Sequence, residues 1–363
     1  MDKDYSSVME ITLGQHLRDL PGPLLLTGHS GFKGTWMTLF LEHLNVPLIG
    51  YSLKPEKDSL FDRAKRTGSI VEKFADIRDY EELEKFIDIH RPSTIIHMAA
   101  QPLVLKSYKN PRETFDVNVM GTVNVLDIAF KKDFIKAIVI VTTDKVYRND
   151  NSGRSFIESD PLEGKDPYSA SKVGTEAVVC AWQQISRTSG GPKIVSVRAG
   201  NVIGGGDFAE DRIIPDLIRG IIAGEAIEIR SPNSTRPWQH VLDPLHGYVK
   251  ALESLITRKD IVSLNFGPTD KSLNVSELVK IGVEHFPILS ELTHNLSKQE
   301  THLESISLGL NPEKSIEELN WQPKWDQVEA ISKTFIWWKR VLEEHSIPVT
   351  VCIQDIEEFL DQN

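Results

Sequence analysis

A tyrosine and a lysine that together could act as a base stand four residues apart in the stretch Tyr168-Ser169-Ala170-Ser171-Lys172. On a helix, this spacing places two side chains on the same face, one turn from each other. A neighbouring ammonium group favours the phenolate, so we expect Lys172 to lower the pKa of Tyr168 toward neutrality. Surface helices often contain this spacing without any chemistry, and its meaning therefore depends on what else the chain places beside it.

A glycine-spaced turn lies near the start of the chain. Residues 24–27 are typical of a short buried strand, and Gly28, Gly31 and Gly34 follow it, with an apolar-periodic helix beginning near Phe32. Glycine permits a tight turn and lets backbone N–H groups approach a pyrophosphate at a helix N-terminus. A plain strand-to-helix turn is the alternative, but the position after the first strand and before a helix favours dinucleotide binding.

A third candidate group, Thr143, Asp144 and Lys145, follows a buried strand predicted over residues 135–142. In parallel sheets, ligands bind at the carboxyl ends of the strands, which is where these three side chains fall. Each has a purely structural alternative. Thr143 could be an ordinary strand-end hydroxyl, Asp144 could cap a turn, and Lys145 could face solvent or contact a phosphate.

Strands and helices alternate with short links over the first two hundred residues, which predicts a parallel sheet covered on both faces. We therefore expect a Rossmann-type doubly wound α/β fold with a smaller, mixed α/β C-terminal substrate lobe, because the alternation stops after the sixth strand. The predicted parts are a dinucleotide-binding domain over 20–201 with a return segment at about 237–265, a substrate lobe over 202–236 and 266–345, and peripheral extensions over 1–19 and 346–363.

Composition excludes several classes of protein. The 363 residues carry a net charge of -11, which leaves no basic excess to bind a nucleic acid. No run of apolar residues is long enough to span a membrane. The cysteines, Cys180 and Cys352, lack the spacing of metal ligands, so we expect no metal site and free thiols in a reducing cytoplasm.

The three stretches in this order resemble an extended short-chain dehydrogenase/reductase that works on nucleotide sugars. The resemblance covers roughly residues 20–340. Within that family the motifs look like those of CDP-glucose 4,6-dehydratases: TGHSGFKG, HMAAQPLV, SYKNPRETFDVNVMGT, TTDKVY, DPYSASK, RAGNVIGGGD, DRIIPDLIRG and RPWQHVLDPLHGY. The pair Asp144-Lys145 is informative, because related dTDP-glucose dehydratases carry Asp-Glu there and sugar epimerases usually lack the acid–base pair.

The resemblance implies an NAD-dependent dehydration of CDP-glucose to CDP-4-keto-6-deoxyglucose, in the biosynthesis of deoxysugars such as those of lipopolysaccharide O-antigen. Another nucleotide-sugar dehydratase or a 4-epimerase, on a UDP, dTDP or GDP sugar, is the alternative. Tyr168, with Lys172, would take the proton of the sugar O4, and Thr143 would orient that oxygen. Asp144 as acid and Lys145 as base would then remove water across C5 and C6, which requires a protonated Asp144 and a neutral Lys145.

The resemblance also implies which residues bind the cofactor and the substrate. The cofactor residues are Gly28, Gly31, Phe32, Lys33, Gly34, Asp76, Ile77, Ala99, Ala100, Gln101, Asn118, Tyr168 and Lys172. The substrate residues are Asn201, Arg212, Arg236 and His240. Two arginines suit a diphosphate, which guanidinium groups grip bidentately, although surface salt bridges are an equal alternative without the family context.

Two further expectations concern cofactor choice and assembly. The predicted second strand ends in Tyr51-Ser52-Leu53-Lys54, with no acid to bind a ribose diol, and Lys54 could meet a 2′-phosphate. These residues leave the choice between NAD and NADP open, and the resemblance implies NAD with NADP not excluded. The family pairs its subunits through helices that match residues 112–130 and 167–187. The resemblance therefore implies a homodimer or a dimer of dimers.

Overall fold

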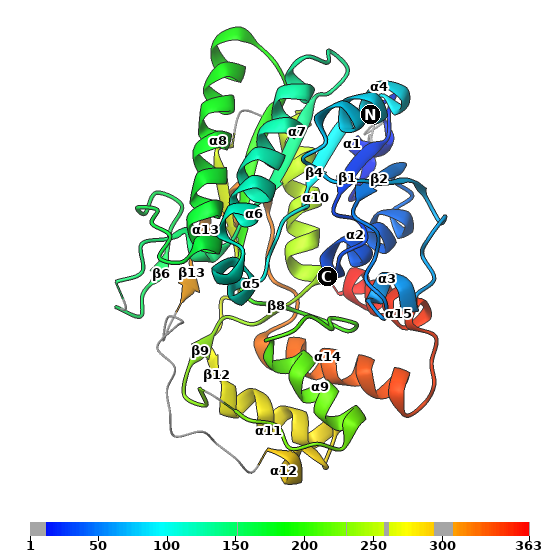
Figure 1. The fold of residues 1–363 in the computed structure, drawn as a ribbon, viewed down its shortest axis with the longest axis vertical. Helices are drawn as coiled ribbons and strands as arrows, with labels where there is room; N and C mark the ends of the chain where they lie inside the picture. Colours follow the sequence, from blue (N-terminus) through cyan, green and yellow to red (C-terminus); the bar gives the residue numbers. More distant parts are fainter. Residues whose placement is uncertain (1–11, 151, 230, 258–260, 294–307, 363) are drawn as a thin grey trace, which may run out of the picture.

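Seven parallel strands form the central sheet, in the order β11-β7-β5-β4-β1-β2-β3 (Figure 1). The computed structural model describes residues 12–150, 152–229, 231–257, 261–293 and 308–362. The strands are β1 (Leu24–Thr27), β2 (Leu48–Ser52), β3 (Val71–Phe74), β4 (Thr94–His97), β5 (Ala137–Val141), β7 (Lys193–Ala199) and β11 (Ser263–Phe266). The strand order reverses between β1 and β4, and ligands of such sheets bind at that switch point. The predicted fold class is confirmed.

Alternate side chains of β1 enter two different cores, one on each face of the sheet. Leu24 and Leu26 pack with Trp36 on the face covered by α2, α10 and α15. Leu25 packs with Val125 on the face covered by α4, α7 and α8. The helices of the two layers are α2 (Phe32–His43), α10 (Leu242–Thr257), α15 (Pro348–Asp361), α4 (Tyr80–His90), α7 (Gly121–Phe130) and α8 (Pro167–Ser189). Because both faces are covered, the central strand β5 is apolar and buried along its whole length, whereas the edge strand β3 carries Glu72 and Lys73.

The long helix predicted over 112–130 is present but is not regular. It consists of α6 (Pro111–Phe115), a π-helical turn η1 (Asp116–Met120) and α7, and the short helix α5 (Val104–Lys109) precedes it. Asn118 lies within η1 and is buried. Single π-helical turns inside helices frequently occur at functional sites.

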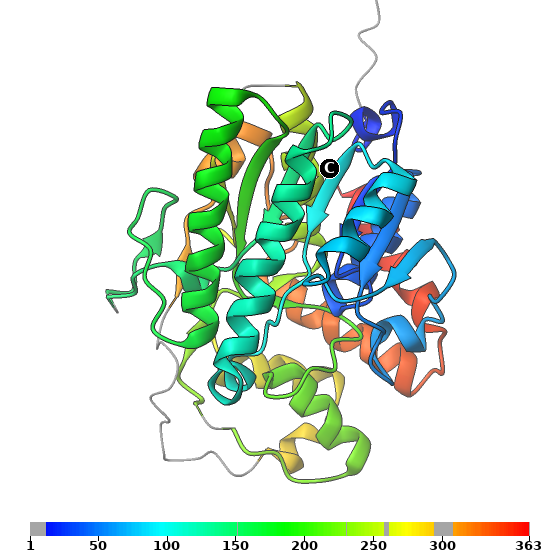
Figure 2. The same ribbon diagram turned by 45° about the horizontal axis from the view of Figure 1, so that its top comes forward.

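The chain leaves the sheet after β7 and returns to it through α10 and β11. Outside the sheet are β8 (Val202–Ile203), α9 (Ile213–Ala223), β9 (Thr235–Arg236), β10 (Gln239–His240), β12 (Leu273–Asn274), α11 (Val275–His285), α12 (Leu289–Leu292), β13 (Gly309–Leu310), α13 (Glu313–Leu319) and α14 (Gln327–Leu342). Of these, α9, α11, α12 and α14 gather at the lower end of the molecule (Figures 1 and 2). The return of 237–265 agrees with the expected division, which itself stays a prediction.

Short elements complete the fold: α1 (Gln15–Arg18), α3 (Leu60–Arg63), the 3-10 turn η2 (Asp144–Val146) and β6 (Ser155–Phe156). Within the described helices, none is long and apolar enough to cross a membrane.

The C-terminal segment 346–363 does not fit the expected peripheral position. Its helix α15 buries Val351, Cys352, Ile356 and Phe359 completely, within the same core as α2. These apolar residues recur at helical spacing after a proline at the first helical position, which is a pattern that favours an amphipathic helix with a core-facing side. At the other end, residues 1–11 of the expected N-terminal extension lie outside the described residues, while Leu17 of α1 is buried.

Candidate active site

The first turn of α8 sets the position of Tyr168. Asp166 caps this helix by accepting a hydrogen bond from the backbone N–H of Ser169, and Pro167 occupies the first helical position. Both features favour a helix start at this point. The backbone N–H of Tyr168 donates to Oγ of Ser107 on α5 at 3.1 Å, and the tyrosine side chain is buried.

Lys172 lies one turn further along α8 and points to the end of β5. Its Nζ donates to the carbonyl oxygen of Val141 at 3.1 Å. Burial lowers the pKa of Lys172 to about 8, and the charge of Glu176 acts in the opposite direction. The amine therefore titrates close to neutral pH rather than well above it.

The pKa of Tyr168 is shifted in the direction opposite to our expectation. Burial raises the pKa of Tyr168 to about 12, while a hydrogen bond with Thr143 and the charge of Arg212 lower it. Lys172 is directed at Val141, so its ammonium group does not contact the phenol. At this site, desolvation of the phenolate outweighs the nearby cations. A further positive charge bound beside Tyr168 would shift its pKa back toward neutrality.

The three residues after β5 begin the turn η2 beside this tyrosine. Oγ1 of Thr143 donates to Oδ1 of the buried Asp144 at 3.0 Å, and the backbone N–H of Lys145 donates to Thr143 Oγ1 at 3.3 Å. Burial raises the pKa of Asp144 against the opposing charge of Lys145. Oδ2 of Asp144 is buried and has no hydrogen-bond partner among the described residues. The carboxyl group is thus held toward its acid form with one oxygen open to a ligand.

The glycine turn contains two glycines that the protein itself requires and one that it does not. Gly28 has φ +75°, and a Cβ there would lie 2.8 Å from the backbone nitrogen of Ala99. A Cβ on Gly34 would lie 2.0 Å from the carbonyl oxygen of Gly28, whereas one on Gly31 would meet only that oxygen, at 3.4 Å. The exposed Gly31 precedes Phe32 at the N-terminus of α2. This open cradle at a helix N-terminus fits the pyrophosphate of a dinucleotide.

Lys33 interacts electrostatically with the catalytic candidates Lys172 and Asp144. Its Nζ lies 5.8 Å from the centre of the Tyr248 ring on α10. Burial, together with the charges of Arg212 and Lys172, lowers the pKa of Lys33 to about 7 against the opposing charge of Asp144. A cation at a helix N-terminus and beside two other cations is unfavourable without an anion, which the phosphates of a ligand would supply.

Gln101 and Asn118 hold the exit of β4 against η1 and α8. The backbone N–H of Gln101 donates to Asn118 Oδ1 at 2.8 Å, and Asn118 Nδ2 donates to the Gln101 carbonyl at 3.1 Å and to Ser171 Oγ at 2.9 Å. Ala99 and Ala100, which precede Gln101, are partly buried. The side chain of Asn118 is thereby used within the protein, in a position to shape this edge of the site.

Asp76 and Ile77, expected near an adenine, have partners in the protein. Arg78 Nη2 lies 2.6 Å from Asp76 Oδ2. Ile77 is buried against Gly121, where a Cβ would lie 2.7 Å from Ile77 Cγ2. Asp79, which follows them, caps α4 by accepting a hydrogen bond from the backbone N–H of Glu82.

Of the expected substrate residues, two arginines act electrostatically on the catalytic candidates. Arg212 Nη1 lies 2.8 Å from Asp207 Oδ2, and the charge of Arg212 acts on Tyr168. The charge of Arg236, on β9, acts on Asp144. Asn201 follows β7 and accepts a hydrogen bond at its carbonyl oxygen from the backbone of Gln239 at 3.0 Å.

His240 does not fit the substrate-binding role that we expected. The residue is completely buried, with its ring 4.5 Å from that of Trp325 and 5.7 Å from that of Trp36. Burial lowers the pKa of His240 to about 3, so it is a neutral packing residue. The reason is tertiary, since β10 lies inside the core that α2 and α14 share. His97 is likewise a packed strand residue, bonded to Thr27 and Thr122.

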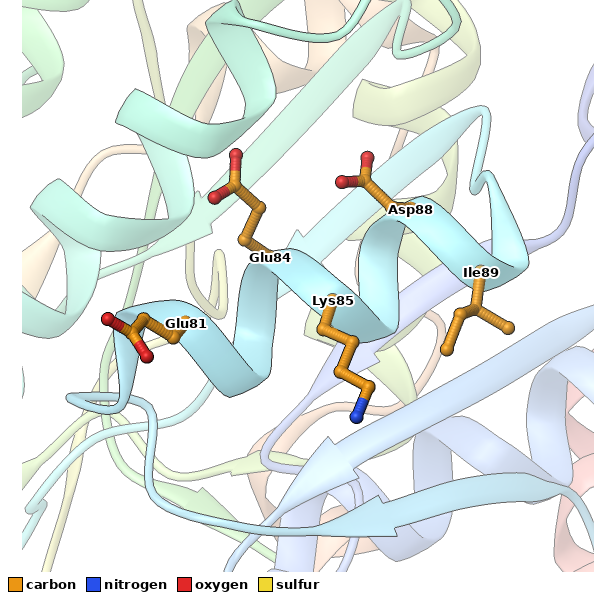
Figure 3. A pocket seen from close by; sticks show the side chains of 5 residues that line it. All are labelled: Glu81, Glu84, Lys85, Asp88 and Ile89. Atoms are coloured by element: carbon orange, nitrogen blue, oxygen red, sulfur yellow. The ribbon is translucent and has the colours of Figure 1, made fainter.

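A hollow of about 490 Å³ on the outer face of α4 is separate from these residues (Figure 3). It is lined by Glu81, Glu84, Lys85, Asp88 and Ile89. Two of its carboxylates, Glu84 and Asp88, already pair with Lys132 at 3.1 and 2.7 Å. None of the residues predicted to do chemistry lines it.

Reasoning from the sequence missed two residues at the site. Glu176 continues the face of Tyr168 and Lys172 by one more turn, a signal that the same spacing rule could have found. Tyr248 is completely buried, and its hydroxyl has no hydrogen-bond partner among the described residues. It contacts Lys33 from α10, and although the segment 237–265 was expected to return to the first domain, no motif singled out this tyrosine.

Comparisons with known proteins agree with this geometry. The chain is 38% identical over 326 residues to a CDP-glucose 4,6-dehydratase of Salmonella typhimurium, across 87% of this chain and 90% of that protein. Among solved structures, a UDP-glucose 4-epimerase of Thermotoga maritima matches with a TM-score of 0.76 at 21% identity, over 88% of this chain and 99% of the other. A dTDP-glucose 4,6-dehydratase of Streptomyces venezuelae, solved with NAD, matches with a TM-score of 0.75 at 24% identity, over 90% and 99%.

The structural likenesses establish the fold, and the sequence comparisons go further. The model of the NAD dependent epimerase/dehydratase family matches residues 24–264, which include the glycine turn, the end of β5 and the Tyr168–Lys172 helix. The chain therefore belongs to the NAD dependent epimerase/dehydratase family.

Proposed function

We propose that this chain is an NAD-dependent nucleotide-sugar 4,6-dehydratase that converts CDP-glucose to CDP-4-keto-6-deoxyglucose. One observation carries the proposal: Asp144, a buried carboxyl group whose pKa is raised, is joined through Thr143 to Tyr168. An epimerase needs the tyrosine and the lysine but no acid beside them. A dehydratase needs the tyrosine–lysine pair and an acid, because it must also release a hydroxyl group as water.

NAD is the cofactor that the residues fit best. The turn from Gly28 to Gly34 would hold the pyrophosphate at the N-terminus of α2, with Lys33 beside it. Bound there, NAD would keep the C4 hydride of the sugar until that hydride returns to C6. The absence of an acid at the end of β2 leaves room for NADP as well, and the comparison with NAD-containing relatives favours NAD.

The first half of the proposed reaction oxidises the sugar at C4. Tyr168 takes the proton from O4 while the hydride leaves C4, and the C4–O4 bond becomes a carbonyl. Thr143, bonded to both Asp144 and the tyrosine, orients O4. Lys172 keeps a positive charge near the phenolate as it forms. Because burial raises the pKa of Tyr168, nearby cations have to lower that pKa before the phenol can act as a base.

The second half removes water across C5 and C6. The C4 carbonyl makes the C5 proton acidic, a base removes that proton, and Asp144 protonates the departing C6 hydroxyl. Lys145 is our candidate for the base. Return of the hydride to C6 and of a proton to C5 completes the 4-keto-6-deoxy sugar. Asp144 suits its part because burial raises its pKa and so favours the protonated form that a general acid needs.

CDP-glucose is the proposed substrate because a CDP-glucose dehydratase is the relative with 38% identity. Arg212 and Arg236 would grip the diphosphate, since both act on the pocket that contains Tyr168 and Asp144. We further propose a place in deoxysugar biosynthesis of the O-antigen type and, from the reduced thiols expected of Cys180 and Cys352, a cytoplasmic location.

We also propose a homodimer or a dimer of dimers, formed through the α6–η1–α7 helix and α8. These helices run side by side along one outer side of the molecule (Figures 1 and 2). They expose the large apolar side chains Phe115, Met120 and Ile185. Exposed apolar side chains on neighbouring helices suit a partner surface of the same kind.

The test is to incubate the full chain and NAD with the CDP, dTDP, UDP and GDP derivatives of glucose and to follow the products by mass spectrometry. We expect loss of one water from CDP-glucose, with a product whose enolate absorbs in alkali. Conversion to an isomer of unchanged mass would instead support a 4-epimerase. No conversion of any member of the panel would refute both readings.

A further inference from the structure

Three successive turns of α8 are joined to three successive residues at the end of β5. Tyr168 shares a hydrogen bond with Thr143, and Lys172 donates to the carbonyl of Val141. Glu176, one turn beyond Lys172, accepts a hydrogen bond from Oγ1 of Thr142 at 2.6 Å. Residues 141–143, which lead into η2, are therefore each hydrogen-bonded to a side chain of α8.

Glu176 is completely enclosed by donors. Arg198, on β7, donates from Nε to Oε1 and from Nη2 to Oε2, both at 2.8 Å, which is a bidentate pair. Oγ of Ser196 donates to Oε2 at 2.9 Å. Burial raises the pKa of Glu176, but Arg198, Thr142 and Ser196 outweigh it, and the net pKa lies below its ordinary value. The carboxylate is therefore charged throughout the neutral range.

This charge acts on Lys172, which has no other carboxylate opposing its desolvation among the described residues. The pKa of Lys172, at about 8, lies so near neutrality that a modest further decrease would remove its charge under ordinary conditions. The surrounding groups do not supply a substitute. His97 on β4 is neutral because burial lowers its pKa to about 3, and Lys33 on α2 is a like charge whose own pKa is about 7.

We propose that Glu176 is a positioning residue for the reaction: its carboxylate keeps Lys172 in the charged form and fixes the end of β5 against α8. The proposal rests on the proposed function, in which a charged Lys172 supports the Tyr168 phenolate. It gives Glu176 a task that a merely structural partner of Arg198 would not have.

The structural alternative has a basis in the same contacts. Nη1 of Arg198 also donates to the hydroxyl of Tyr147 at 2.8 Å and to the carbonyl of Glu158 at 3.1 Å. The Glu176–Arg198 pair therefore joins α8 and β7 to the segment that follows η2. Removing one member of a buried ion pair destabilises a protein strongly, so loss of activity alone would not separate the two roles.

The separating measurement is the pH profile of turnover. Activity should fall as pH rises through the pKa of Lys172, because the charged amine is the active form. In Glu176→Gln, which keeps the shape but loses the charge, we expect this alkaline limb to move to lower pH by about one unit. Thr142→Val is the matched control, since it removes the hydrogen bond and keeps the carboxylate. We expect lower turnover from it with the limb unmoved.

Glu176→Gln leaves Arg198 buried and unpaired, and a second variant protects the test against unfolding. The double variant Glu176→Gln with Arg198→Met removes both charges and should show the same movement of the limb. Lys33→Met checks the assignment, because the limb should persist without Lys33. A folded Glu176 variant with the wild-type alkaline limb would overturn the proposal.

A readout independent of turnover separates this inference from the proposed function. The Lys172 amine can be titrated by NMR of protein labelled with ¹³C at lysine Cε, with the resonance assigned by its loss in Lys172→Arg. We expect a lower midpoint in the Glu176 variants than in the wild type. An unchanged midpoint would refute the role of Glu176, whereas a wild type that dehydrates no nucleotide sugar would refute the function and leave the titration decisive for Glu176.

Discussion

Burial favours the protonated forms of both Tyr168 and Asp144, although the proposed reaction asks opposite things of them. The phenol has to lose its proton at the start of the cycle, and the carboxyl group has to keep its proton until the elimination. Cations around the phenol resolve this difference. Arg212 acts on Tyr168, and Lys172 and Lys33 lie in the same pocket, so a bound ligand that excludes water would strengthen each of these interactions.

Replacing the phenol tests the first step. We expect Tyr168→Phe to reduce turnover by between about 10²- and 10⁴-fold, the usual contribution of a general acid or base, with folding intact. The buried ring remains, and only a hydroxyl bonded to Thr143 is lost. Steady-state kinetics gives the reduction, and circular dichroism gives the fold. Turnover like that of the wild type would remove the mechanism.

Replacing the acid–base pair tests the second step. We expect Asp144→Asn and Lys145→Ala to slow elimination more than oxidation at C4, because neither group is needed to form the ketone. Rapid-mixing absorbance of the reduced cofactor and mass spectrometry of the sugar follow the two steps separately. If Lys145→Ala slowed both steps equally, Lys145 would not be the C5 base.

At the level of elements, the turn between β1 and α2 has to meet a requirement of folding and a requirement of cofactor binding. Gly28 and Gly34 are required for the backbone of the turn to pass Ala99 and to close on itself. Gly31 has no such requirement, and its space faces outward at the N-terminus of α2. The same triplet of glycines therefore combines a folding constraint with a binding one, and substitution can separate them.

Two alanine substitutions in this turn should differ clearly in their effect on stability. Gly34→Ala would bring a Cβ to 2.0 Å from the Gly28 carbonyl oxygen, and we expect a loss of about 1–3 kcal/mol from overpacking. Gly31→Ala, at φ -74° with a nearest contact of 3.4 Å, should leave stability unchanged or slightly raised while it weakens NAD binding. Urea denaturation and fluorescence titration with NAD measure the two effects. Equal destabilisation by both variants would contradict this division.

The sequence predicted elements well where one local pattern was sufficient. The strand predicted over 24–27 is β1 (Leu24–Thr27), and the helix expected to begin near Phe32 is α2 (Phe32–His43). The π-helical turn around Asn118 could not be predicted, because it depends on contacts with Gln101 and Ser171 from distant parts of the chain. His240 was assigned from a motif, and its burial between tryptophans depends on how β10 packs. The prediction of a lowered pKa for Tyr168 was wrong for the same reason, since desolvation depends on how the whole chain packs around the phenol.

At the level of the whole molecule, α15, the last helix, packs against α2, the helix that follows the glycine turn. The side chains of α15 pack in the same cluster as Trp36, Met37 and Phe40 of α2. Lys324 donates to carbonyl oxygens at the end of α15, including that of Phe359 at 2.9 Å. The C-terminal helix α15 thus supports α2, the helix at whose N-terminus the cofactor is expected to bind.

Truncation of a single side chain tests this support. Phe359 is completely buried, and we expect Phe359→Ala to lower the free energy of unfolding by about 3 kcal/mol or more. Ile353→Ala, on the exposed side of the same helix, is the matched control and should change stability by less than about 1 kcal/mol. Urea denaturation measures both. Similar small changes in the two variants would show that α15 is dispensable.

The return of the chain to β11 has a consequence for how such proteins diversify. The segment between β7 and α10 is fastened to one sheet at both ends, so it behaves as an insert rather than as an appended module. Its packing against α2 limits where it can change, because Trp36 donates to the Gly205 carbonyl at 3.0 Å and Leu217 packs in the same core as Trp36. Variation that leaves the redox machinery intact is therefore confined to the positions of this insert outside that core. Conversely, a gene fragment that stops at β7 would lack the edge strand of its own sheet.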